Sequence, residues 1–173
     1  LSTVAPPSLE AMVRVLARDD GIYYGWYVAL ACFLGTFVVY GLSYSFGVFF
    51  DVILTDLGGS RGGTALVFSV HTFVLYVSAF LVGGVVDAYG ARGPLLGGGV
   101  LLGVGLYWTS HAGSLLELFL AYGVCVALGL GVVFVVSYAT LPRWFGRRRG
   151  RAGGIASAGL GLGMVLVAPG AAM

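Results

Sequence analysis

The sequence predicts an all-helical, multi-pass membrane protein, and three observations carry that prediction. Of its 173 residues, 59% are hydrophobic and only 9% are charged, whereas a soluble domain carries about a quarter of charged residues. The charged residues gather in short stretches between long apolar runs. Those runs do not alternate polar with apolar residues, so helices rather than barrel strands are expected to satisfy the backbone in lipid.

Residues 1–23 are expected to form a cytosolic lead with a short amphipathic helix. A loop at Pro6 and Pro7 is followed by Ser8, a favoured helix N-cap residue. After it, apolar residues recur on one helical face: Leu9, Met12, Val13 and Leu16. Both a helix on the membrane surface and a simple linker helix fit this pattern.

Residues 24–173 are predicted to form one transmembrane bundle of five helices. Each predicted span is an apolar run bounded by charged or turn residues, at about 24–50, 62–86, 93–110, 118–142 and 152–173. Aromatic residues mark both ends of the first span, as membrane–water interfaces favour. Small residues at a spacing of four, such as Gly159 and Gly163, allow two helices to approach closely.

Arginines set the expected orientation of this bundle. Five of the nine lie in a basic loop between the fourth and fifth spans: Arg143, Arg147, Arg148, Arg149 and Arg151. Each would cost roughly 2.5–3.5 kcal/mol at the bilayer centre, so the loop must lie in water. Arg14, Arg18 and Arg92 fall on the same side, whereas Arg61 alone falls on the other. This asymmetry predicts a multi-pass protein with a cytoplasmic N-terminus.

Motifs of catalysis or cofactor binding are absent from the sequence. It contains no complete G-x-G-x-x-G or P-loop, no H-E-x-x-H, no C-x-x-C and no carboxylate pair within a span. Cys32 and Cys125 fall in apolar runs, where a cysteine behaves as a small hydrophobe. The arginines mark a membrane boundary rather than a nucleic-acid-binding surface. We therefore expect no enzyme, no cofactor, no metal and no nucleic-acid partner.

Aromatic and hydroxyl side chains within the spans are the candidates for lining a substrate site. They are Phe33, Phe37, Tyr40 and Tyr44 on one face of the first span, His71 in the second, and Phe134, Ser137 and Tyr138 in the fourth. A buried tyrosine hydroxyl needs a hydrogen-bond partner, which either a substrate carboxylate or ordinary helix packing can supply. His71 fits either a functional site or a bond to a neighbouring carbonyl.

Three stretches resemble the major facilitator superfamily. The turn GGVVDAYGARG at residues 83–93 resembles its G-x-x-x-D-[RK]-x-G-x-[RK]-[RK] conformational loop through Gly83, Asp87, Gly90 and Arg92. Small or apolar residues replace two of the basic residues of that loop. DGIYYGWYV at residues 20–28 resembles the start of span one in monocarboxylate porters. WFGRRRGRAGGIASAGLGLG at residues 144–163 resembles the start of span five, which those porters share with oxalate–formate antiporters.

The resemblance implies a twelve-helix fold of two bundles, of which this chain would be the truncated N-terminal bundle. It implies a secondary active transporter of small organic anions, of the monocarboxylate or dicarboxylate type, that works in the plasma membrane by alternating access. Its partners would be the anion, a coupling proton or exchanged anion, the lipid bilayer and the missing C-terminal half. Tyr44 stands where animal monocarboxylate transporters carry a lysine, so their proton–lactate mechanism does not transfer directly. A non-transporting membrane sensor or assembly protein is the alternative.

Overall fold

A computed structural model of the chain describes residues 24–56, 60–144 and 149–170. Helices account for nearly all of these residues, and no strand occurs among them. The predicted all-helical class is therefore confirmed for the described part of the chain. The predicted lead at residues 1–23, with its amphipathic helix, lies outside the described residues.

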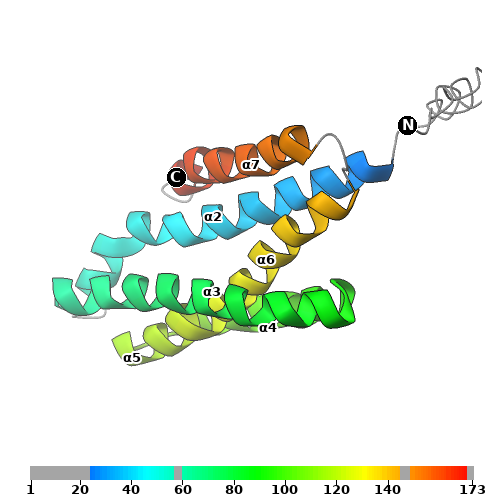
Figure 1. Cartoon of the computed structure of the whole chain (residues 1–173). Helices are drawn as coiled ribbons and strands as arrows, with labels where there is room; N and C mark the ends of the chain where they lie inside the picture. Colours follow the sequence, from blue (N-terminus) through cyan, green and yellow to red (C-terminus); the bar gives the residue numbers. More distant parts are fainter. Residues whose placement is uncertain (1–23, 57–59, 145–148, 171–173) are drawn as a thin grey trace, which may run out of the picture.

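Short connections join the successive helices (Figure 1). The helices are α2 (Tyr24–Asp56), α3 (Arg61–Tyr89), α4 (Arg92–Ser110), α5 (Leu115–Leu118), the π-helical segment η1 (Phe119–Val126), α6 (Ala127–Trp144) and α7 (Arg149–Gly170). Ser60 caps α3, because its hydroxyl oxygen accepts the backbone N–H of Gly63. Ser114 caps α5 by accepting the backbone N–H of Glu117 in the same way.

Among the described residues, three helical segments are long and apolar enough to cross a membrane: Gly25–Asp56, Arg61–Tyr89 and Leu115–Leu141. Gly153–Val167 of α7 is apolar but shorter. Helix α4 has 19 residues and many glycines, which lower its hydropathy. The chain is a multi-pass membrane protein, and the assignment of α4 and α7 as two further spans stays a prediction.

Helix α6 lies at the centre of the arrangement, in contact with α2, α3 and α4. Helix α7 runs alongside α2 (Figure 1). Its glycines allow this close approach, because a Cβ atom at Gly159 would overlap the backbone of Phe33 and one at Gly163 would overlap that of Phe37. The Thr36 hydroxyl crosses the same contact and donates to the carbonyl of Ala156 over 2.7 Å.

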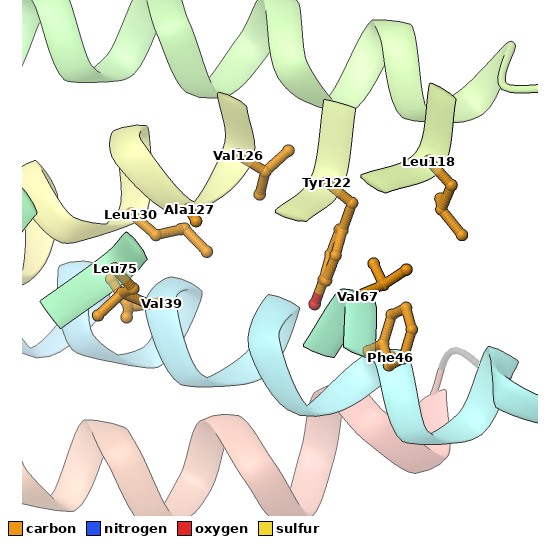
Figure 2. Close-up of a cluster of buried hydrophobic side chains, with 9 residues drawn as sticks. All are labelled: Val39, Phe46, Val67, Leu75, Leu118, Tyr122, Val126, Ala127 and Leu130. Atoms are coloured by element: carbon orange, nitrogen blue, oxygen red, sulfur yellow. The ribbon is translucent and has the colours of Figure 1, made fainter. Parts of the chain in front are cut away.

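The largest buried cluster joins α2 and α3 to the continuous segment formed by α5, η1 and α6. Its buried members are Val39, Phe46, Val67, Leu75, Leu118, Tyr122, Val126, Ala127 and Leu130. Figure 2 shows Tyr122 reaching from η1 towards α2, where it lies near Phe46 and Val67. Outside this cluster, Phe73 and Phe80 of α3 are 68% and 84% exposed. Apolar exposure on that scale is expected where lipid or a further helix, rather than water, surrounds the bundle.

The segment predicted as one α-helical span at 118–142 contains a stretch of different geometry. Residues Phe119–Val126 form a π-helix, whose turns are wider than those of an α-helix. Within it, the Tyr122 carbonyl accepts a hydrogen bond from the His71 side chain of α3. Apolar periodicity cannot reveal such a stretch, because residues on all sides of it are apolar.

Candidate functional site

His71 connects three helices and is fully buried. Its Nδ1 atom lies 3.0 Å from the carbonyl oxygen of Tyr122, and its Nε2 atom lies 3.1 Å from the hydroxyl of Ser43. A carbonyl oxygen can only accept, so Nδ1 carries the proton. In the neutral imidazole, Nε2 then accepts the hydrogen bond that Ser43 donates. Of the two roles that the sequence left open for His71, the bond to a neighbouring carbonyl is therefore present.

Tyr122 supports the His71 ring from the η1 side. The two rings stack with centroids 4.4 Å apart and planes 15° apart. The Tyr122 hydroxyl donates towards the carbonyls of Leu42 and Ser43, at 3.1 and 3.2 Å. Because every polar atom of this group has a partner, Ser43, His71 and Tyr122 form a satisfied buried network, which rigidifies the contact of α2, α3 and η1.

An aromatic layer borders this network on the side of α6. Tyr40 and Tyr44 of α2 have ring centroids 6.2 Å apart, and Phe134 of α6 lies 6.2 Å from Tyr40 in an edge-to-face arrangement. Tyr76 of α3 meets the same Phe134 ring at 5.9 Å, and Tyr138 lies 5.0 Å from it. Three helices thus bring tyrosine rings together around one phenylalanine ring.

A cavity of about 100 Å³ lies between α2 and α3, beside the network and the aromatic layer. Its lining residues are Val39, Tyr40, Ser43, Tyr44, Phe68, His71, Thr72, Leu75 and Tyr76. The lining combines hydroxyl groups with aromatic and aliphatic surface and contains no charged side chain. Such a mixture can hold a small polar ligand, with the apolar walls excluding water and the hydroxyls fixing its orientation.

The predicted lining residues are only partly brought together. Tyr40, Tyr44 and His71 border the cavity, and Phe134 and Tyr138 belong to the adjoining aromatic layer. Phe37 instead stacks on Phe33 with centroids 6.4 Å apart, near the contact with α7. Ser137 is buried against Gly35, and its hydroxyl donates to the carbonyl of Val133 at 2.8 Å.

Sequence reasoning missed several residues of this site, namely Ser43, Phe68, Thr72, Tyr76 and Tyr122. One signal could have found part of the set. Phe68, Thr72 and Tyr76 recur every four residues on α3, so they share a helix face close to that of His71. Tyr122 carried no such signal, because it stands alone in an apolar run.

The turn between α3 and α4 holds the predicted conformational loop. Gly90 ends α3 with φ of 86°, the single positive φ among the described residues, and its N–H donates to the Val86 carbonyl at 3.0 Å. Glycine adopts this backbone conformation without strain. Asp87 and Arg92 flank the turn with exposed side chains, and Gly83 packs near Val135. The geometry supplies a tight turn, and a conformational role for these four residues stays a prediction.

The predicted basic loop falls partly outside the described part of the chain. Arg147 and Arg148 lie outside the described residues. Arg143 lies within α6, and Arg149 and Arg151 lie within α7, with no description of their side chains. The assignment of these five arginines to an aqueous loop therefore remains a prediction.

Comparison with known proteins identifies a matching family model and several similar sequences. Residues 32–173 match the family model of the Major Facilitator Superfamily. Monocarboxylate transporter 3 of Rattus norvegicus is 39% identical over 136 residues, which cover 79% of this chain and 28% of that protein. Monocarboxylate transporter 4 of Rattus norvegicus is 32% identical over 150 residues, covering 87% and 31%. Monocarboxylate transporter 11 of Homo sapiens is 33% identical over 164 residues, covering 95% and 35%. The chain spans about a third of the length of these curated relatives.

Proposed function

Because the chain belongs to the major facilitator superfamily, we propose that it acts within a secondary active transporter of small organic anions. The substrates would be of the monocarboxylate or dicarboxylate type, and transport would proceed by alternating access. The names of the relatives, each a monocarboxylate transporter, support the substrate class.

The observation that carries this proposal is the cavity between α2 and α3. Tyr40, Tyr44 and Tyr76 are among its lining residues, and a phenol hydroxyl is a suitable donor to a carboxylate oxygen. Its volume of about 100 Å³ suits a small ligand. Its position in the apolar interior of a multi-pass bundle is the position expected of a transporter site.

A second wall of the site is proposed to come from the rest of the transporter, the C-terminal half expected from the twelve-helix fold. Thr72 and Tyr76 border the cavity and also an open groove of about 530 Å³ on the outer face of α3. Phe73 and Phe80, both strongly exposed, continue that groove. An apolar face continuous with the cavity suits a facing helix, which would close the site and could supply a cation for the anion.

We also propose a plasma-membrane location with the N-terminus in the cytoplasm. The distribution of arginines, with all but Arg61 on one side of the predicted spans, supports this orientation. In it, the turn with Asp87 and Arg92 and the basic loop both face the cytoplasm. There the turn would form part of a charge network whose rearrangement accompanies the switch between outward-open and inward-open states.

Counterflow into proteoliposomes tests the proposal. The protein at its full natural length is reconstituted with unlabelled L-lactate or oxalate inside, and uptake of the labelled anion is followed. We expect saturable, transient accumulation. Protein that binds neither anion and gives no uptake would support the non-transporting alternative, and conductance without saturation would indicate a channel.

A matched pair of arginines sharpens the same assay. Arg61 and Arg92 each begin a helix and are exposed, but they lie at opposite ends of α3 and the turn that follows it. We expect Arg92→Gln to lower the counterflow rate at least about tenfold, because the conformational loop loses its cation, with folding retained. Arg61→Gln should leave the rate within about twofold. Equal counterflow rates in the two variants would show that Arg92 has no specific conformational role.

A further inference from the structure

The pair formed by Ser43 and His71 lies at the edge of the cavity and joins a titratable ring to a hydroxyl group. Both residues line the cavity, and the Ser43 hydroxyl lies 3.1 Å from Nε2 of the buried His71 ring. The opposite ring nitrogen is fixed by the Tyr122 carbonyl. The position of one hydroxyl proton therefore depends on the protonation of the ring.

The surroundings of the pair are uncharged in the described part of the chain. The titratable groups that face it are tyrosines: Tyr40 and Tyr44 from α2, Tyr76 from α3 and Tyr122 from η1. No carboxylate or guanidinium group borders the cavity. A buried charge without a partner is strongly unfavourable, so neither an imidazolium nor a carboxylate is stable here alone.

We propose that proton uptake by His71 reverses the direction of the hydrogen bond between its ring and the Ser43 hydroxyl. This reversal couples anion binding in the cavity to proton binding. In the neutral state, Ser43 donates to Nε2 and offers only lone pairs to the cavity. When a proton from solvent binds Nε2, that nitrogen donates to the Ser43 oxygen. The Ser43 hydrogen is then free to point into the cavity and bind a carboxylate oxygen. The bond from Nδ1 to the Tyr122 carbonyl is present in both states, so the ring need not move.

Coupling follows because each charge stabilises the other. The carboxylate supplies the negative charge that the imidazolium lacks, and the proton supplies both the positive charge and the hydroxyl donor that the carboxylate lacks. By linkage, a proton that raises anion affinity is itself bound more tightly when the anion is present. His71 is thus a positioning residue that acts on the substrate through Ser43. This inference rests on the proposed anion transport and assigns a titratable group to it.

Calorimetric binding of L-lactate to the purified full-length protein tests the coupling. Titrations in buffers of different ionisation enthalpy give the number of protons taken up per bound lactate. We expect about one proton per lactate at a pH where free His71 is neutral, and an affinity that falls about tenfold per pH unit as the pH rises. His71→Asn keeps an amide N–H near the position of Nδ1 and removes Nε2. It should lower the proton uptake attributable to the cavity to about zero and flatten the pH profile.

The chain offers a matched control in His111, its other histidine. There Nδ1 lies 3.0 Å from both the Tyr107 carbonyl and the Ser110 hydroxyl, but the residue is exposed at the end of α4. His111→Asn should leave proton uptake and the pH profile unchanged. Ser43→Ala keeps His71 and removes only the hydroxyl, so it should lower lactate affinity several-fold and lose the coupling.

The outcomes separate this inference from the function on which it rests. Lactate binding with unchanged proton uptake in His71→Asn would overturn the inference and leave anion transport standing, with the acid carried already protonated. An absence of binding and counterflow for both lactate and oxalate in the wild type would overturn both the inference and the proposed function.

If the His71→Asn protein does not fold, a measurement on the wild type still tests the coupling. In ¹⁵N-histidine spectra of the wild type, lactate should convert the signal of a neutral, Nδ1-protonated ring into that of an imidazolium, and an unchanged spectrum at saturating lactate would reject the coupling.

Discussion

The two sides of α2 make contacts of opposite kinds. Towards α7, small residues bring backbones together, and Thr36 is fully buried with its hydroxyl bonded across the contact. Towards α3, bulky aromatic side chains hold the helices apart, and a cavity with hydroxyl groups in its lining remains between them. One helix therefore has a closed side that fixes the bundle and an open side that can hold a ligand. The difference shows that the volume of the side chains, rather than their hydrophobicity, determines where this bundle leaves space for a ligand.

The largest effect is expected on the closed side. Gly159→Leu would overlap the Phe33 carbonyl and the Thr36 side chain, so overpacking should destabilise the bundle by about 3 kcal/mol or more. Gly161 lies two residues away with no atom near its Cβ position, and Gly161→Leu should be nearly neutral. Monodisperse yield and thermal unfolding in detergent measure both. Equal stability of the two variants would show that α7 does not pack on α2 as described.

A smaller loss is expected when the buried network on the open side is broken. His71→Phe keeps a ring of similar size but leaves the Tyr122 carbonyl and the Ser43 hydroxyl without their partner. Two unpaired buried groups should lower stability by about 2 kcal/mol. His71→Asn, which can still donate to the Tyr122 carbonyl, should recover about half of that loss. A thermal shift assay compares the two variants, and a His71→Phe protein as stable as the wild type would mean that the network contributes no stability.

Tyr122→Phe removes a single hydroxyl from the same network. The hydroxyl donates to the carbonyls of Leu42 and Ser43, and one such bond contributes about 1 kcal/mol. Stacking on His71 and Phe46 is preserved, because the ring remains. Denaturation in detergent should show the loss, and Tyr107→Phe, an exposed tyrosine at the end of α4, provides the neutral comparison.

The smallest effect on stability, and a specific effect on transport, is expected in the cavity lining. Tyr40→Phe keeps the ring contact with Phe134 and removes a hydroxyl that interacts with Tyr76, another residue of the cavity lining. We expect stability to fall by only about 0.5 kcal/mol and the KM for the anion to rise about two- to tenfold, the effect of one hydrogen bond. Labelled-anion uptake as a function of concentration measures it. A lower unfolding temperature with an unchanged KM would assign the Tyr40 hydroxyl to packing instead.

The spacing of the charged residues, together with long apolar runs that do not alternate with polar residues, predicted the all-helical, multi-pass class. Charged residues are excluded from lipid strongly enough that the gaps between them mark the helices. The small-residue pair Gly159 and Gly163 was likewise predictive, because close helix contacts in lipid depend on small side chains. These parts of the fold follow from residue type and need no knowledge of which helices are neighbours.

The site followed from the sequence only in part, because a helix face does not identify its neighbour. Phe37 and Tyr40 lie on one broad face of α2, yet Phe37 borders the contact with α7 whereas Tyr40 borders the cavity next to α3. The bond from His71 to Tyr122 joins residues 51 positions apart, and no local pattern encodes such a pair. The π-helical geometry of η1 was hidden because Phe119–Val126 is apolar on all sides.

Accessibility of introduced cysteines tests the central claim, that α2 has one closed side and one side open to substrate. Cys32 and Cys125 are first replaced by alanine in the full-length protein, and Thr36→Cys, Tyr40→Cys and Thr72→Cys are then labelled with a small hydrophilic thiol reagent with and without L-lactate. We predict that Tyr40→Cys and Thr72→Cys react and are protected by lactate, while Thr36→Cys does not react. Reaction of Thr36→Cys with the same lactate protection, or no reaction at Tyr40→Cys and Thr72→Cys, would contradict the account.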